Sequence, residues 1–458
     1  MNQVTDSRNR ITFGLGTIGR DMLYSLVSMY LIFYLTDILQ TDSSTLWWLT
    51  GIILFARIFD ALNDPIMGTI VDNTRSRYGK FKPWILIGAL LSGVFTLLLF
   101  ADMGLTGSGY VVAFAIIYIG WGISFTVNDI SYWSLLPSLS MDQKIREKIG
   151  AFARICANIG LFTVVAGIVP LTKMLGESLG SMKQAYFVFA IGVVIIMWLG
   201  QSITLFGVRE PRGQFKSQET TTLKGMVEAI FRNDQLLFTA VSMALFMIGY
   251  VTTTNFGLYF FKYAYGDEGM YAIFAVILGV SQIAALSVFP LFSKRFPRRR
   301  LYQGATITVV AGYIIFFFSP MNMLFIGTAG LLLFMGQAFI QLLMLVFLAD
   351  TIEYGQWKLG RRNDSVSFSL QPFINKMGGA VGSGITGATI IISGINDAET
   401  AADVTSEGLL IMKTSMLVLP LICIVAGYLV YHFKYKIDQK FFDKIVSDLK
   451  SRGEIVGE

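Results

Sequence analysis

The chain has 458 residues, of which 54% are hydrophobic and only 14% are charged, and its formal net charge is +6. A soluble globular protein carries roughly 25% charged residues. The composition therefore excludes an ordinary soluble domain and predicts an all-α integral membrane protein. The single His and two scattered Cys provide no nucleophile–base pair and no metal cluster, so we expect no catalytic residue and no enzymatic activity.

The first predicted span, residues 12–38, contains the stretch GLGTIG at residues 14–19. Its G-x-G-x-x-G spacing matches the dinucleotide-binding fingerprint, which must follow a strand and open a helix. No strand pattern precedes these glycines, and a long apolar helix contains or follows them. The sequence therefore predicts that Gly14, Gly16 and Gly19 allow a close approach between membrane helices.

A helix that crosses a bilayer needs about 20 mostly apolar residues, and the chain contains twelve such runs. They lie near 12–38, 45–70, 83–101, 110–136, 148–172, 184–208, 236–263, 270–293, 301–318, 321–349, 366–394 and 408–432. We therefore predict an N-terminal six-helix bundle over 1–208, a cytoplasmic central loop over 209–235, a C-terminal bundle over 236–435 and a cytoplasmic tail over 436–458.

Lys and Arg concentrate in alternate loops. The loops after the second, fourth and eighth spans read DNTRSRYGKFK, MDQKIREK and KRFPRRR, whereas TDILQTDSS and ADMGLTGSG contain neither Lys nor Arg. Because basic residues concentrate on the cytoplasmic side of a membrane, this pattern predicts that both termini and the basic loops are cytoplasmic. The topology explains the positive net charge, so we expect no nucleic-acid partner.

Charged residues inside the spans are the main functional candidates. A charge at the bilayer centre costs at least roughly 2.5–3.5 kcal/mol and usually faces a substrate or ion path. The first span carries Arg20 and Asp21. Because adjacent residues point about 100° apart on a helix, the two cannot simply neutralise each other on one face. Asp21 is therefore predicted to be a functional carboxylate. For each charged residue in a span, the alternative is a structural ion pair or a side chain that extends to the membrane interface.

The second span reads FARIFDALNDPIMG and places Asp60 and Asp64 at i and i+4, with Asn63 near the same side. Two carboxylates on one helix face repel each other unless a cation lies between them or one is protonated. Carboxylate and amide oxygens are hard ligands that suit a small hard cation. The pattern favours a site for a small cation or a proton, and the alternative is a structural Arg57–Asp60 pair.

The fourth span contains FTVNDISYWS, in which Thr126, Asp129 and Trp133 are spaced by three and four residues and form one stripe. A carboxylate accepts hydrogen bonds from sugar hydroxyls, and an indole ring can cover the apolar face of a pyranose. A Trp alone is more often a packing or interface residue, but Asp129 beside it favours sugar recognition. Arg154 in the fifth span and Lys376 in the eleventh are predicted to neutralise acids across the bundle, in a substrate or a coupling role.

Four stretches resemble the glycoside–pentoside–hexuronide:cation symporter family. They read DPIMGTIVDNTRSRYGKFKPWILIG, FTVNDISYWSLLP, FRNDQL and ADTIEYGQWKLGRRNDS, and the resemblance extends over nearly the whole chain. It implies the major facilitator fold, in which two pseudo-symmetric six-helix bundles hold a sugar site between them near the midplane. It also implies a multi-pass protein of the bacterial cytoplasmic (inner) membrane.

The resemblance implies roles for individual residues. For the sugar it implies Asp21, Asp129, Trp133 and Arg154, with Arg20 assisting. For the cation it implies Asp60, Asp64, Asn63 and Thr126, with Lys376 close to both sites and counted with the sugar ligands. For a cytoplasmic gate of salt bridges it implies Asp72, Arg75, Arg77 and Asp350. The family typically has Lys at the position of Arg20, which keeps the charge but changes the geometry.

The expected function is symport of a small neutral glycoside, such as a galactoside, with Na⁺ or H⁺ by alternating access. We expect no cofactor, and we expect the protein to work as a monomer in the lipid bilayer. Asp21 and Asp129 would repel a hexuronate, so a pentoside is the second choice, and a pentoside or hexuronide symporter is the alternative within the family. A sugar sensor that binds without transporting is the alternative from another class.

Overall fold

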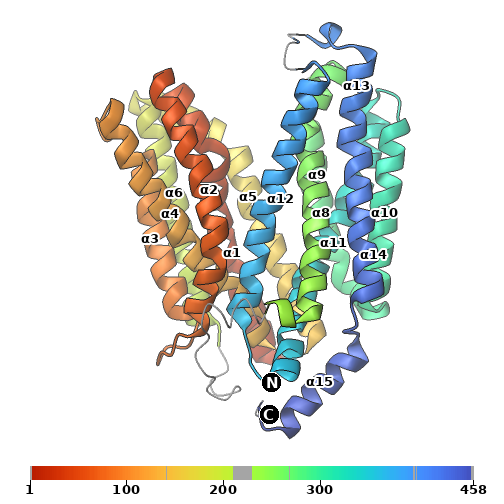
Figure 1. The fold of residues 1–458 in the computed structure, drawn as a ribbon. Helices are drawn as coiled ribbons and strands as arrows, with labels where there is room; N and C mark the ends of the chain where they lie inside the picture. The colour runs from red at the N-terminus through yellow and green to blue at the C-terminus, as the bar shows by residue number, and fades with distance from the viewer. Residues whose placement is uncertain are drawn as a thin grey trace. The chain divides into compact units, whose positions relative to one another are not determined.

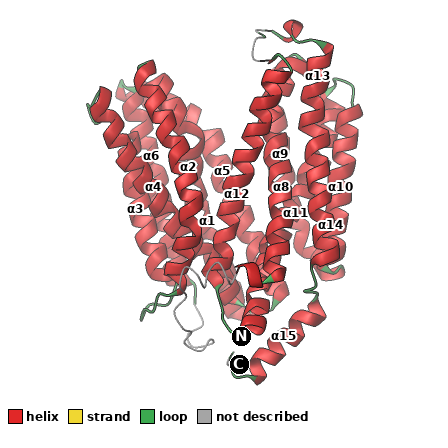
Figure 2. Ribbon diagram, viewed as in Figure 1, coloured by secondary structure: helices red, strands yellow, loops and turns green. Residues whose placement is uncertain are grey.

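The computed structural model of the chain describes residues 3–140, 142–209, 230–267, 269–395, 398 and 400–454. These residues form helices and connecting loops, with no strand among them (Figure 2), so the predicted all-α class is confirmed. The chain divides into two compact units. The first contains Met1–Val227, Asn363–Ser369 and Lys450–Glu458, and the second contains Glu228–Arg362 and Leu370–Leu449. Most of the predicted central loop lies outside the described residues.

The first unit contains six long helices that run side by side (Figure 1). They are α1 (Gln3–Phe33), α2 (Ser43–Asp72), α3 (Lys82–Phe100), α4 (Gly107–Leu135), α5 (Gln143–Leu179) and α6 (Met182–Gly207). Helix α1 packs against α5 and α6, and α4 packs against α2 and α3. This arrangement places the charged residues of the first five predicted spans within one unit.

The second unit contains most of the remaining helices. They are α8 (Asp234–Tyr259), α9 (Met270–Arg295), α10 (Arg298–Phe318), α11 (Met323–Leu359), α12 (Asp364–Ile392), α13 (Ser406–Lys413), α14 (Leu419–Lys434) and α15 (Gln439–Ser451). Short π-helical segments, Phe260–Tyr265 and Thr414–Val418, extend α8 and join α13 to α14. Helix α12 begins within the first unit, because Asn363–Ser369 belongs there.

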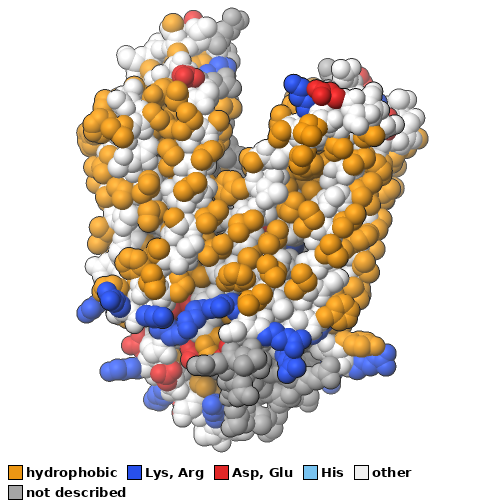
Figure 3. Space-filling model, turned by 180° about the vertical axis from the view of Figure 1, so that it is seen from behind, with side chains coloured by type: hydrophobic (Ala, Val, Ile, Leu, Met, Phe, Trp, Pro, Cys, Tyr) orange, Lys and Arg blue, Asp and Glu red, His pale blue; other side chains and the backbone are white. Residues whose placement is uncertain are grey.

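Nine stretches in the described part of the chain are long and apolar enough to cross a membrane. Helices α1, α2 and α12, with 31, 30 and 29 residues, coincide with the other three predicted spans. Large apolar side chains are exposed on many of the helices, including Phe206 on α6 and Phe318 on α10. On the face in Figure 3 the hydrophobic surface covers the length of the helices, and Lys and Arg gather near one end. Such an extensive apolar surface suits contact with lipid rather than water.

The three glycines of GLGTIG lie within α1, and each allows a close contact between helices. A Cβ atom at Gly14 would collide with the ring of Phe152 on α5, and one at Gly19 would collide with the backbone of Met197 on α6. Gly16 lies equally close to Thr204 on α6. The predicted packing role is therefore confirmed, and the helical context excludes the dinucleotide-binding geometry.

A buried amide network fixes the position of α4 in the first unit. Asn128 Nδ2 donates hydrogen bonds to the Ile85 carbonyl on α3 (2.9 Å) and to Gln201 Oε1 on α6 (3.0 Å). Gln201 Nε2 donates in turn to the Gly16 carbonyl on α1 (2.8 Å). Because buried amides are costly unless paired, this network restrains the rotation of α4 and thereby directs its functional face.

The predicted tail contains a helix that was not among the predicted elements. Helix α15 buries Phe442, Ile445 and Leu449, which are spaced by three and four residues on one face. Trp357 Nε1 at the end of α11 donates a hydrogen bond to Asp448 (3.0 Å). The tail helix is thus packed onto the second unit by an apolar face and a polar contact.

Candidate functional site

Arg20 is the centre of the predicted sugar site. Its guanidinium donates hydrogen bonds to Asp129 Oδ1 on α4 (2.7 Å) and to Asp21 Oδ2 on α1 (3.2 Å). The Arg20 side chain is 4% exposed, whereas those of Asp21 and Asp129 are 25% and 20% exposed. The Arg20 guanidinium is therefore buried, whereas the two carboxylates remain partly accessible. Their accessible oxygens could accept hydrogen bonds from a polar ligand.

The ion pair between Arg20 and Asp21 was not expected from the sequence, because adjacent residues on a helix point in different directions. The backbone directions of Arg20 and Asp21 diverge, but the long arginine side chain bends far enough for one nitrogen to reach Asp21. A second nitrogen of the same group reaches Asp129. Sequence reasoning gave Arg20 an assisting role, and only the length and fork geometry of the side chain could have indicated the bridge.

Trp133 lies against two guanidinium groups. The Arg20 guanidinium carbon is 5.1 Å from the Trp133 ring centroid, and that of Arg154 on α5 is 4.7 Å away. Arg20 also lies 4.9 Å from the ring centroid of Tyr132. Cation–π contacts of this kind hold charge at a fixed distance from the ring. Trp133 is only 5% exposed, so in this structure its ring faces arginines more than open space.

Arg154 carries a buried donor that the rest of the described chain leaves unused. Its Nε atom is buried and has no hydrogen-bond partner among the described residues, although Arg154 interacts electrostatically with Asp21 and Asp129. A buried donor on a charged group is costly when it is left unsatisfied. A hydroxyl-rich ligand that entered beside Asp21 and Asp129 would supply the missing acceptor.

The residues of the predicted cation site lie on two packed helices, α2 and α4. Thr126 Oγ1 donates a hydrogen bond to Asp64 Oδ1 (3.2 Å), and Asp64 is fully buried. The Asp60 carboxylate faces Gly122 on α4, where an added Cβ would lie 2.8 Å from Asp60 Oδ1. Asn63 Nδ2 is buried and lacks a hydrogen-bond partner within the described part of the chain.

These four side chains would offer a cation only oxygen ligands. Two carboxylates, a hydroxyl and the oxygen of an amide suit a small hard cation or a shared proton. Among the described residues, no group of three or more His, Cys, Asp or Glu side chains that could hold a metal ion occurs. Gly122, which sequence reasoning missed, lies four residues before Thr126, and that spacing was the available signal. The alternative Arg57–Asp60 pair involves a side chain outside the described residues.

Asp72, predicted as a gate residue, caps the start of α12 within the first unit. Its two carboxylate oxygens accept hydrogen bonds from the backbone N–H groups of Ser365 and Val366 (2.9 Å each). Lys80 lies between two acids, 2.6 Å from Asp72 and 3.3 Å from Asp364. Neither Lys80 nor Asp364 was among the predicted gate residues, because nothing in a linear pattern pairs residues so distant in the chain.

The other predicted residues lie elsewhere. Arg75 and Arg77 are exposed in the loop after α2, and Arg77 donates a hydrogen bond to the neighbouring Tyr78 hydroxyl (2.6 Å). Asp350 is fully buried on α11 in the second unit, where it pairs with Arg298. Lys376 is half-buried on α12, also in the second unit. The roles suggested for these residues and the relation of Lys376 to the first-unit carboxylates therefore stay predictions.

Residues 12–439 match the sequence family described as MFS/sugar transport protein. The chain belongs to this family. The raffinose carrier protein of Pediococcus pentosaceus is 30% identical to the transporter, over 96% of this chain and 71% of that protein. The lactose permease of Lactobacillus helveticus is 31% identical, over 97% and 72%. The predicted resemblance is thus confirmed, and the chain is a multi-pass transporter rather than an enzyme.

A solved structure supports the same fold. The crystal structure of an E. coli fucose:proton symporter superposes with a TM-score of 0.67, at 13% identity, over 95% of this chain and 99% of that one. At this identity the likeness establishes the major facilitator fold alone. The transporter therefore has the predicted fold class.

Proposed function

We propose that the transporter carries a small neutral glycoside, such as melibiose or another galactoside, together with Na⁺ or H⁺. The carrying observation is the arrangement on α4, where Thr126 contacts Asp64 and Asp129 contacts Arg20. Asp129 is the third residue after Thr126, so the two side chains start less than one helical turn apart. An ion and a sugar bound there would act on the same short stretch of helix.

The chemistry of the site favours a neutral sugar. Asp21 and Asp129 keep accessible carboxylate surface and can accept hydrogen bonds from hydroxyls, while Arg154 offers an unused donor. A hexuronate would meet two carboxylates and be repelled. Two relatives are named for raffinose and lactose, which are neutral sugars. A pentoside or hexuronide is the second candidate within the same family.

The proposed coupling is electrostatic. A cation or proton between Asp60 and Asp64 removes their mutual repulsion and orders the contact with Thr126. That ordering fixes the segment of α4 that presents Asp129, so the sugar binds better to the ion-loaded form. By linkage the sugar must improve ion binding by the same factor. The loaded transporter then opens to the other side of the membrane by alternating access.

The proposed setting is the bacterial cytoplasmic membrane, with both termini on the cytoplasmic side. The Asp72–Lys80–Asp364 cluster lies beside the basic loop after α2 and would belong to the cytoplasmic gate. Arg75, Arg77 and Asp350 are further gate candidates, and Lys376 would serve both binding sites. We propose a functional monomer that needs no cofactor.

Ion movement in sealed proteoliposomes tests this proposal. Melibiose, lactose, a xyloside and glucuronate are added in turn while a sodium electrode and a pH electrode record the outer solution. We expect one neutral glycoside to draw Na⁺ or H⁺ into the vesicles, and we expect an Asp21→Asn variant to abolish the signal. Calorimetric binding of a sugar that moves no ion would instead indicate a sensor, and movement with glucuronate alone would indicate a hexuronide symporter.

A further inference from the structure

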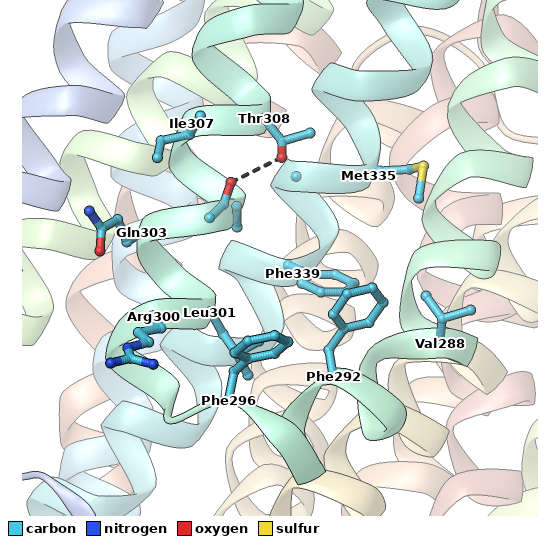
Figure 4. A pocket seen from close by; sticks show the side chains of 13 residues that line it. Val288, Phe292, Phe296, Arg300, Leu301, Gln303, Ile307, Thr308, Met335 and Phe339 are labelled. Carbon is cyan, nitrogen blue, oxygen red and sulfur yellow. Dashed lines mark hydrogen bonds between the residues drawn. The ribbon is translucent and has the colours of Figure 1, made fainter.

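A groove on the surface of the second unit is not explained by sugar transport. It has a volume of about 530 Å³ and lies between α9, α10 and α11 (Figure 4). Its walls are formed mainly by apolar side chains, including Val288, Phe292, Phe296, Leu301, Ile307 and Phe339. The volume is within the roughly 300–1,000 Å³ of small-molecule sites, so the groove can hold a ligand of substantial size.

The groove opens onto the hydrophobic surface rather than into the helix bundle. Phe292 is 46% exposed and Ile307 is 60% exposed. Gly304 lines the groove, and a Cβ atom added there would meet no atom within 4 Å. The Thr308 hydroxyl already donates a hydrogen bond to the Gly304 carbonyl (2.9 Å), as Figure 4 shows. The middle of the groove therefore suits an apolar chain.

One end of the groove is positively charged. Arg300 lines this end beside Phe296 and Leu301 (Figure 4). Its two neighbours are engaged elsewhere, since Arg298 pairs with Asp350 and Arg299 donates to the His432 carbonyl (3.2 Å). The Arg300 backbone N–H donates to the Pro297 carbonyl (2.9 Å), but its guanidinium has no hydrogen-bond or ion-pair partner among the described residues.

The backbone reinforces the positive charge at this end. Helix α10 begins at Arg298, and its N-cap residue, Pro297, makes no side-chain capping bond. Cations are unfavourable at a helix N-terminus, whereas an anion is stabilised there by the free N–H groups and the helix dipole. Because Arg298 is neutralised by Asp350, the unbalanced positive charge beside the apolar groove comes from Arg299 and Arg300 in the first turn of α10.

We propose that this groove binds an anionic phospholipid, with an acyl chain along the apolar walls and the phosphate against Arg300. Basic pockets between membrane helices on the cytoplasmic side are suited to anionic headgroups, and the loop before α10 is predicted to be cytoplasmic. The charge at Arg300 favours a lipid with net negative charge over a zwitterionic one. This site is separate from the sugar and cation residues, and it does not depend on the proposed substrate.

Native mass spectrometry of the full chain in detergent tests the headgroup contact. The probes are phosphatidylglycerol and phosphatidylcholine with identical acyl chains. We expect the parent protein to bind phosphatidylglycerol at least fivefold more tightly, and Arg300→Gln to reduce this preference to below twofold. Arg295→Gln is the matched control, because it removes an exposed arginine at the end of α9, five positions before Arg300, that does not line the groove. Equal loss in both variants, or no preference in the parent protein, would overturn the proposal.

A second pair of variants tests the groove itself. Gly304→Leu places a side chain in the empty space, and we expect it to weaken binding of both lipids at least fivefold. Gly192→Leu is the control, because Gly192 on α6 also has open space around an added Cβ and lies in the other unit. Unchanged lipid binding in Gly304→Leu overturns the proposal. The proposal is also overturned if the parent protein is a dimer and Gly304→Leu converts it to a monomer. The groove would then be an interface between two copies of the chain.

Discussion

At the scale of single residues, the site depends on how Arg20 shares its charge. One guanidinium group pairs with Asp21 and Asp129 from two different helices while staying buried. Removing one partner of a buried pair leaves charge that the protein interior does not solvate. The carboxylates of this cluster are partly accessible, so part of that cost is relieved by water. Substitutions here should therefore affect ligand binding more than folding.

Asp129→Asn is expected to weaken sugar binding by about 10- to 100-fold, because a hydrogen bond to a charged group is worth roughly 1.5–3 kcal/mol. Isothermal titration with the transported sugar measures the change. Asp102→Asn serves as a control, since Asp102 is a loop carboxylate that pairs with Lys183. Thermal stabilisation of the variant by the coupling ion would show that the protein is still folded. Sugar binding within twofold of the parent value would contradict the assignment of Asp129.

Thr126→Val is expected to raise the half-saturating concentration of the coupling ion by about 10-fold, because a hydrogen bond to a buried carboxylate is worth roughly 1.5–3 kcal/mol. The measurement is sugar uptake as a function of Na⁺ concentration and of pH. Thr163→Val removes an exposed hydroxyl on α5 that bonds only within its own helix, and it should leave both curves unchanged. Identical ion dependence in the two variants would exclude Thr126 from the cation site.

At the scale of helices, small residues and caps determine which surfaces meet. Glycines on α1 allow contact with α5 and α6, and Gly122 on α4 leaves space for the Asp60 carboxylate on α2. Asp72 at the end of α2 accepts two backbone hydrogen bonds from the start of α12. The packing of these helices therefore depends on a few positions. At some of them a glycine leaves space for the neighbouring helix, and at Asp72 a single carboxylate makes the contact.

Gly19→Ala is expected to destabilise the protein by about 1–3 kcal/mol or more, as overpacking of a well-packed core does, because the new Cβ would collide with the Met197 backbone. Gly192→Ala, with open space around the added atom, should be neutral or slightly stabilising. Thermal unfolding in detergent compares the two. Equal melting temperatures would mean that α1 and α6 are not in close contact at Gly19.

Asp72→Ala is expected to release the start of α12, because loss of an N-terminal cap costs about 0.5–2 kcal/mol and this variant also loses the ion pair with Lys80. Hydrogen–deuterium exchange of the peptide containing Ser365 and Val366 should become at least 10-fold faster. Asp42→Ala removes the cap of α2 instead, where Asp42 accepts from Thr45 N–H (2.9 Å). That control should leave exchange at α12 unaltered, and similar protection in both variants would contradict the capping role.

At the scale of the whole molecule, the distribution of charge along the chain reports its topology. Loops rich in Lys and Arg alternate with loops that have few or none, the weakest case being the segment between the fifth and sixth predicted spans with Lys173 and Lys183. Figure 3 shows basic side chains gathered near one end of the helices. This alternation carries the proposed orientation, because the translocation of short loops is governed by their basic residues.

Ser76→Cys and Ser108→Cys test that orientation. Ser76 is exposed in the basic loop after α2, and Ser108 is exposed at the start of α4, next to a loop without Lys or Arg. We expect a membrane-impermeant maleimide to label the Ser108 variant in intact cells, and the Ser76 variant only after permeabilisation. The parent chain, whose Cys156 is buried and whose Cys423 is partly buried, gives the background. The opposite pattern would invert the proposed topology.

Sequence patterns predicted the spans and the close packing at Gly14, Gly16 and Gly19, because lipid exposure and helix contact impose composition directly on a segment. They also selected the charged side chains of α1, α2 and α4. They did not predict that Arg20 bridges two acids, that Gly122 faces Asp60, or that Lys80 joins Asp72 to Asp364. Helical periodicity identifies the face of a helix, but the partner across from that face depends on packing between distant segments.

The separation of Thr126 and Asp129 on α4 has a consequence for how many ions accompany each sugar. Three residues of α-helix rise by about 4.5 Å, and hydrogen-bonded backbone holds that distance far more firmly than a loop would. In the proposed mechanism each sugar site is therefore accompanied by one ion site, because the same helix carries a residue of each. Replacing Trp133 or Arg154 to accept a different sugar is then expected to alter the cargo while the stoichiometry of transport stays constant.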